Sequence, residues 1–255
     1  MAALVGGCVR VNAPLRVGVE AAKVVDLTYA YGPETIYWPT AESFKLEEVA
    51  HGTTPQGYWY AANNICMAEH GGTHMDAPIH FAEGKRDAAE VPLSSCIGPA
   101  VVVDVRRQAA ANRDYRLTVA DLAGWERDHG RIPAGAIVVM NSGWGRFWPD
   151  KKSYLGTDKL GDVAGLHFPG FSLEAATFLL HEREIAAIAV DTPSIDYGQS
   201  TDFLVHRAIN GADKPGFENV AGLDRVPPIG ATFLALPMKI ENGSGGPARI
   251  IAVLP

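Results

Sequence analysis

The chain has 255 residues, of which 47% are hydrophobic and 20% are charged. This length and mixture suit a globular protein with a sizeable buried core, and they exclude a disordered, collagen-like or coiled-coil chain. The net charge of -7 provides no basic surface for a nucleic-acid backbone, and no apolar run approaches the roughly 20 residues of a membrane span. We therefore expect neither nucleic acid nor a membrane among its partners.

Three cysteines, Cys8, Cys66 and Cys96, show neither paired spacing nor a CxxC motif. This usage fits a reducing compartment, so we expect a cytoplasmic protein whose cysteines are small core residues. No tract rich in proline, glycine or serine is long enough to be an interdomain linker. We predict a single domain over residues 24–255, preceded by an N-terminal extension of residues 1–23.

Strands are predicted near both ends of the chain and in its middle. The first hundred residues are rich in turns and aromatic residues and contain few helix starts. Three short β-branched runs follow, at 99–105, 136–141 and 185–191, and their lack of polar alternation predicts strands that are buried on both faces. Two further strands are expected at 231–236 and 249–254.

Two helices are predicted between the central strands. Thr118 can cap one that ends at Gly130, with Asp121 placed to meet its free amides, and Ser172 can cap the other. The succession of strand, helix, strand, helix and strand predicts a mixed α/β fold whose central sheet is covered by helices.

The densest chemistry in the sequence lies at residues 70–81, which read HGGTHMDAPIHF. His70, His74, Asp76 and His80 fall within eleven positions, although the whole chain has only 8 histidines. Imidazole nitrogen and carboxylate oxygen together form the ligand set of Zn²⁺, Mn²⁺ and Fe²⁺. The segment therefore predicts a metal site.

The spacing within this motif excludes a helix, because the aspartate would leave the helix face that the first two histidines share. Ten fully extended residues would span roughly 33 Å, too far for the ligands of one ion. The chain must therefore bend, and the glycines at 71–72 and the Ala-Pro at 77–78 permit this. We expect His70 to fold back towards Asp76, and His80 to be an acid–base group rather than a ligand.

The motif resembles the HxGTHxDxPxH signature of the cyclase superfamily of metal hydrolases, which includes bacterial kynurenine formamidase and isatin hydrolase. The resemblance extends from about residue 24 to the C-terminus. At residues 40–41 the chain has Thr-Ala where the formamidases have Gly-Asp. Its further matching segments are Asp26-Leu27-Thr28, Tyr37-Trp38-Pro39, Asp191-Thr192-Pro193-Ser194-Ile195-Asp196, His206, Glu218-Asn219, 236–239 and 247–249.

The resemblance implies a swivelling β/β/α single domain with a mixed central sheet, assembled as a homodimer or tetramer. It also implies one or two divalent ions per chain, Zn²⁺ or Mn²⁺. The ligands that it implies are His70, His74, Asp76, His206 and Glu218, with Asp76 bridging the two ions.

The resemblance further implies that Trp38 and Phe81 contact the substrate and that His80 carries protons. From the residues alone, a histidine such as His206 is more often structural, and Glu218 would by default be a solvated surface charge. Asp191, at the end of a predicted strand, fits either a ligand-binding loop or a capping role.

We predict metal-dependent hydrolysis of a carbon–nitrogen amide bond in a small aromatic substrate. Metal-activated water would be the nucleophile and His80 the general acid and base. The substrate is either an aryl formamide of the N-formylkynurenine type or a cyclic amide such as isatin. Trp38 and the aromatic run at 58–60 favour a flat substrate, or they are ordinary core residues.

Two other classes of protein fit the same residues. A non-hydrolytic Fe²⁺ oxygenase also uses two histidines and a carboxylate. A binding protein could have kept the ligands and lost turnover.

Overall fold

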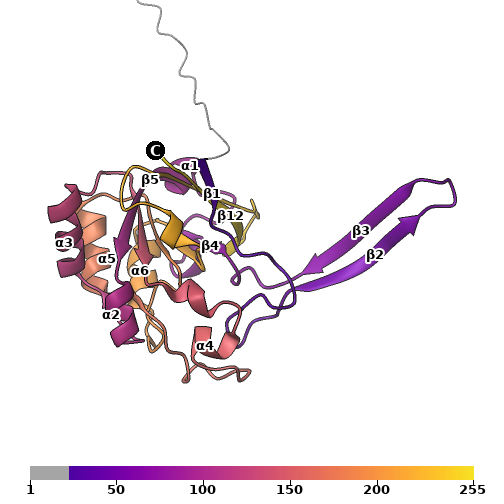
Figure 1. Ribbon diagram of the computed structural model, residues 1–255, viewed down its shortest axis with the longest axis horizontal. Coiled ribbons are helices and arrows are strands. Elements are labelled where there is room, and N and C mark those ends of the chain that lie inside the picture. Colours follow the sequence, from indigo (N-terminus) through magenta and orange to yellow (C-terminus); the bar gives the residue numbers. More distant parts are fainter. Residues whose placement is uncertain (1–22) are drawn as a thin grey trace, which may run out of the picture.

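A computed structural model describes residues 23–255 (Figure 1). Except for Lys23, the N-terminal extension expected at 1–23 lies outside the described residues, and so does Cys8. Its main sheet has eight strands, in the order β1-β12-β11-β5-β7-β9-β10-β4, and β12 also pairs with β4, which closes the sheet. The strands are β1 (Val24–Asp26), β4 (His74–Asp76), β5 (Ile97–Asp104), β7 (Ile137–Asn141), β9 (Ala187–Val190), β10 (Gly216–Glu218), β11 (Thr232–Pro237) and β12 (Gly245–Val253).

The sheet is mixed, as the sequence predicts. Strands β5, β7, β9 and β10 run parallel to one another, and the remaining pairs in the sheet are antiparallel. The three central runs predicted as strands are β5, β7 and β9, and the two predicted near the C-terminus are β11 and β12. The expected α/β class is therefore confirmed.

Both predicted helices form where their capping residues place them. Helix α3 (Val119–His129) starts with a capping box, in which the Thr118 hydroxyl accepts a hydrogen bond from the Asp121 backbone N–H and the Asp121 carboxylate accepts one from the Thr118 backbone N–H. Helix α5 (Leu173–Glu182) begins after Ser172, whose hydroxyl oxygen accepts a backbone hydrogen bond in the first turn.

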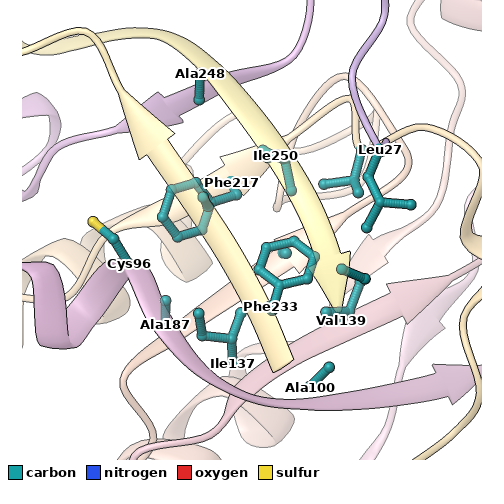
Figure 2. Packing of buried hydrophobic residues seen from close by; sticks show 14 of the residues in the cluster. Leu27, Cys96, Ala100, Ile137, Val139, Ala187, Phe217, Phe233, Ala248 and Ile250 are labelled. Atoms are coloured by element: carbon teal, nitrogen blue, oxygen red, sulfur yellow. The ribbon is translucent and has the colours of Figure 1, made fainter. Parts of the chain in front are cut away.

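Successive residues of β5 alternate between two hydrophobic clusters. Ala100 and Val102 belong to the cluster inside the closed sheet, where the rings of Phe217 and Phe233 lie 6.4 Å apart (Figure 2). Val101 belongs to the second cluster, between the sheet and helices α3 and α5. Both faces of the strand are thus buried, which explains its uninterrupted apolar sequence.

Among the described residues, every helix is too short or too polar to cross a membrane. The remaining elements are short. They are α1 (Leu93–Cys96), α2 (Arg106–Ala111), α4 (Lys151–Leu155), α6 (Leu204–Gly211), the 3-10 helices η2 (Pro78–His80), η3 (Trp144–Phe147) and η4 (Leu223–Arg225), and the strand pair β6 (Arg116–Leu117) and β8 (Gly170–Phe171).

A long hairpin projects from the body of the molecule (Figure 1). Its strands are β2 (Lys45–Thr53) and β3 (Trp59–Cys66), which among the described strands pair only with each other. The aromatic run at 58–60 lies here with 51% to 62% of each residue exposed, so its interpretation as core is wrong for this chain, and none of its residues lines the cavity described below. The expectation of core cysteines is wrong for Cys66, which is exposed on this hairpin, and is confirmed for Cys96.

Candidate metal centre

Five side chains of the predicted ligand set converge where β4, β10 and α6 meet. His74 and Asp76 lie on β4, and His70 precedes that strand. Glu218 ends β10 directly opposite His74 in the antiparallel pair, while His206 lies in α6. The fold thus brings together residues that are far apart in the sequence.

The predicted bend before β4 is present. Gly72 has a left-handed backbone (φ 57°), and a Cβ atom there would lie 2.8 Å from the ring of Tyr31. The turn returns His70 towards the strand, so that its Nδ1 lies 2.7 Å from Oδ1 of Asp76. The second bend, after Ala77, is the 3-10 helix η2.

Asp76 is the centre of the cluster. Its Oδ1 lies 3.2 Å from Nε2 of His74, and its Oδ2 lies 3.2 Å from Nε2 of His206. Glu218 is next to both histidines, at 3.3 Å from Nε2 of His206 and 3.5 Å from Nε2 of His74. The donor atoms form two groups that share Asp76, namely His70-His74-Asp76 and Asp76-His206-Glu218. Within each group, the donor atoms lie within 4.8 Å of one another.

The chemistry of these groups fits a divalent cation. Nδ1 of His74 donates to the Gly72 carbonyl oxygen at 2.9 Å, which leaves Nε2 as the nitrogen whose lone pair can bind an ion once its proton is displaced. That Nε2 atom is buried, faces two carboxylates and has no hydrogen-bond partner among the described residues. A cation between these atoms would satisfy it.

The electrostatics also favour a cation. Burial and the neighbouring charge of Asp76 raise the pKa of Glu218 to about 6. Burial opposes the ionisation of Asp76, but hydrogen bonds from His206 and His70, together with the positive charge of a protonated His74, hold its pKa well below its ordinary value. Burial alone would lower the pKa of His74, yet Asp76 and Glu218 raise it to about 9. The two buried carboxylates therefore need positive charge beside them, which protons or a metal ion can supply.

Further polar residues orient the outer nitrogens of two histidines. Nδ1 of His206 lies 2.7 Å from the buried Asp196 carboxylate, and Nε2 of His70 lies 2.8 Å from Oγ of Ser244. Ser244 in turn donates to Glu69. Sequence reasoning missed these roles: Asp196 was visible only within the family-like segment 191–196, and the sequence around Ser244 carries no signal.

A cavity of about 280 Å³ opens beside the cluster. The expected contact residues Trp38 and Phe81 line it, together with Phe203, which the sequence did not indicate. His80 also lines it, and its ring stacks on that of His70 with centroids 3.8 Å apart. Burial lowers the pKa of His80 to about 3, below the near-neutral value expected from the sequence, because sequence does not reveal burial.

Asp191 has a structural role at the carboxyl end of β9. Its carboxylate accepts hydrogen bonds from the backbone and hydroxyl of Ser142 and from the backbone of Trp144. Asp191 thereby caps the loop that follows β7, and not residues 192–194, which follow Asp191 itself.

Comparisons with known proteins identify related chains. The Cyclase family model matches residues 25–197. The isatin hydrolase of Roseibium aggregatum is 32% identical over 91% of this chain and 92% of its own length, and the kynurenine formamidase of Salinibacter ruber is 26% identical over 89% and 96%. The solved structure of isatin hydrolase A from Ralstonia solanacearum has a TM-score of 0.83 and 35% identity, covering 91% of this chain and 92% of that one.

Proposed function

The chain belongs to the Cyclase family, and on that premise we propose that it is a metal-dependent hydrolase of a carbon–nitrogen amide bond in a small aromatic substrate. The membership confirms the resemblance inferred from the motif. The observation that carries the proposal is the adjacency of the histidine–carboxylate cluster, His80 and an aromatic cavity. The isatin hydrolase and kynurenine formamidase relatives are named for reactions of this kind.

The residues that would hold the metal are those of the two groups that share Asp76. Their imidazole and carboxylate donors suit Zn²⁺ or Mn²⁺, and the shared aspartate supports a site for two ions as well as for one. When bound, such an ion polarises a carbonyl group and lowers the pKa of water.

The surroundings of His80 support a role in moving protons. Its ring is held between His70, on which it stacks, and Phe81, at a centroid distance of 4.6 Å. Its low pKa keeps the imidazole neutral at neutral pH, so that one ring nitrogen has a free lone pair, although the low pKa also makes it a weak base. It would take the proton of the attacking water and return it to the departing nitrogen.

The cavity favours an uncharged, flat substrate. Trp38 lies 6.3 Å from the ring of Phe168 and 6.4 Å from that of Phe203, which gives it a fixed aromatic wall. Among the described residues that line the cavity, none is lysine or arginine. A zwitterionic amino acid such as N-formylkynurenine would therefore find no Lys or Arg partner for its carboxylate, whereas a cyclic amide such as isatin needs none. We favour the cyclic amide.

The test is hydrolysis of isatin and of N-formylkynurenine by metal-loaded protein, followed by absorbance. We expect a higher kcat/KM for isatin, and a lower one for Trp38→Ala with both substrates. A preference for N-formylkynurenine would overturn the substrate assignment. Absence of turnover of either compound, with metal bound, would overturn the hydrolase assignment in favour of a binding protein.

The same assay, run without oxygen, separates hydrolysis from oxygenation. A hydrolase retains its activity under anaerobic conditions with Zn²⁺ or Mn²⁺. An Fe²⁺ oxygenase would instead consume oxygen and stop without it.

We further propose that the chain forms a homo-oligomer through the β2–β3 hairpin. Leu46 and Ile65 lie opposite each other in the hairpin, and Trp59 shares their face. These three residues are 53% to 62% exposed, and an isolated two-stranded hairpin is marginally stable in water. A second copy that covers this face would stabilise it.

Light scattering of the wild type and of a Trp59→Ser, Ile65→Ser double variant tests the assembly. We expect a dimer or tetramer for the wild type and a smaller species for the variant, with Leu160→Ser, an exposed leucine elsewhere, as the unchanged control. A monomeric wild type would overturn the proposal.

The exposed thiol of Cys66 supports a reducing, cytoplasmic location.

A further inference from the structure

Asn219, the residue after Glu218, has an unusual backbone for a buried side chain. Its φ of 55° lies in the left-handed region, which asparagine adopts more readily than most residues but still at a cost. Both of its backbone groups are used: its N–H donates to the Thr192 carbonyl at 2.9 Å, and its carbonyl accepts from the Thr73 hydroxyl at 2.7 Å. The surroundings thus hold the residue in this conformation.

The side-chain amide of Asn219 connects two parts of the site. Its Nδ2 donates to the carbonyl oxygen of Gly72 at 2.7 Å, and its Oδ1 lies 2.9 Å from the hydroxyl of Tyr154, which can donate to it. The Gly72 oxygen also accepts from Nδ1 of His74 at 2.9 Å. Asn219 and His74 therefore share one acceptor, which lies in the left-handed turn before β4.

We propose that Asn219 is a positioning residue for the metal centre and acts through His74. Its amide fixes the Gly72 carbonyl where that oxygen holds the proton of His74 on Nδ1. Nε2 of His74 then keeps its lone pair directed at the space beside Asp76 and Glu218. The inference rests on the proposed metal site and adds a residue whose side-chain hydrogen bonds, within residues 23–255, go to Gly72 and Tyr154 and not to a metal donor.

The backbone and side-chain roles of Asn219 can be separated. Glycine adopts the left-handed conformation without strain, so Asn219→Gly keeps the turn and removes only the amide. Asn242 provides a matched control, because it is also left-handed (φ 58°) and its side chain has no hydrogen-bond partner within residues 23–255. Asn242→Gly therefore changes the same residue type in the same conformation.

The first measurement is the Kd for Mn²⁺ and for Zn²⁺, by competition with a chelator. We expect Asn219→Gly to bind each ion about 10- to 100-fold more weakly, the usual effect of losing a group that orients a ligand. Asn242→Gly should bind as tightly as the wild type. Tyr154→Phe, which keeps the bond from the amide to Gly72 and loses only the outer hydroxyl, should show a loss of about fivefold.

The second measurement is the protonation of His74 by ¹⁵N NMR in the Zn²⁺-loaded protein. We expect a slowly exchanging proton on Nδ1 in the wild type, and faster exchange of that proton in Asn219→Gly. The wild-type spectrum is decisive without any variant: a proton on Nε2 of His74 would overturn the inference.

Equal metal affinity of Asn219→Gly and the wild type would also overturn it, and would leave Asn219 with a backbone role only. Failure of the proposed metal site looks different, because the wild type itself would then bind neither ion, and failure of the hydrolase assignment alone would leave the ions bound without turnover.

Discussion

The carboxylate of Asp196 lies 2.7 Å from Nδ1 of His206 and also accepts the backbone N–H of that histidine at 3.0 Å. The pair is buried, and although burial opposes ionisation of Asp196, the hydrogen bond from His206 lowers its pKa. This contact fixes the proton on Nδ1 and directs Nε2 at Asp76 and Glu218.

Replacing Asp196 should therefore weaken metal binding. We expect Asp196→Asn, which keeps the shape and loses the charge, to raise the Kd for Mn²⁺ or Zn²⁺ by about 10- to 100-fold. Chelator competition measures this change. The exposed Asp202 lies nearby, and Asp202→Asn should leave the Kd as it is. An unchanged Kd in the Asp196 variant would show that His206 is not a ligand or does not need this partner.

His80 should be needed for turnover and not for metal binding. Its ring lies on that of His70, at the wall of the cavity, and outside both groups of candidate ligands. We expect His80→Ala to keep its full metal content while kcat falls at least about 10²-fold, the usual scale of an acid–base contribution. Elemental analysis and steady-state kinetics check the two parts. Loss of metal from the variant would make His80 a ligand.

The ion pair between Glu126 and Arg183 should stabilise the fold in a pH-dependent way. It joins α3 to the end of α5 through two contacts, of 2.6 Å and 2.8 Å, and Glu126 also accepts the Ile132 backbone N–H. The pKa of Glu126 lies below its ordinary value of 4.5, chiefly because of the hydrogen bond from Arg183. The ion pair therefore stabilises the fold fully above about pH 4.5, and this stabilisation is lost as the pH falls through the lowered pKa of Glu126 in the folded protein.

Glu126→Gln tests this linkage. At neutral pH we expect the free energy of unfolding to fall by about 1 kcal/mol, and the gap between wild type and variant to close on acidification. Urea titrations at a series of pH values give both quantities. A gap that stays constant, or widens, as the pH falls would contradict the assignment.

The two described cysteines should differ in reactivity. Cys66 is exposed on β3, whereas burial raises the pKa of the Cys96 thiol to about 11. Because the thiolate is the nucleophile, iodoacetamide at mildly alkaline pH should label Cys66 and spare Cys96. Peptide mass spectrometry distinguishes them, and unfolding in urea should make both react. Rapid labelling of Cys96 in the folded protein would contradict its buried position.

Local signals in the sequence predicted the elements that local physics decides. Thr118 and Ser172 cap helices because their hydroxyls reach amides within the same turn. The motif at 70–81 bends where its glycines permit it, and His70 returns to Asp76 as expected. The family resemblance, rather than spacing, supplied His206 and Glu218, because only the sheet brings them to the motif.

Features that depend on distant contacts were not predictable. No local pattern around Asn219 or Ser244 indicates that either will face residues 70–74, since those contacts exist only after β10 and β12 pair with β4. The aromatic run at 58–60 was misplaced for a similar reason: periodicity shows that a strand is apolar, and not whether anything in the same chain covers it.

The candidate ligands extend along the chain from His70 to Glu218, so they converge only in a folded molecule. An unfolded chain would offer a cation only the donors of the short motif and would hold it far more weakly. Each tenfold increase in the free-ion concentration above its Kd should then raise the free energy of unfolding by about 1.4 kcal/mol. Cellular ion supply would thus govern the lifetime of this protein as well as its catalytic output.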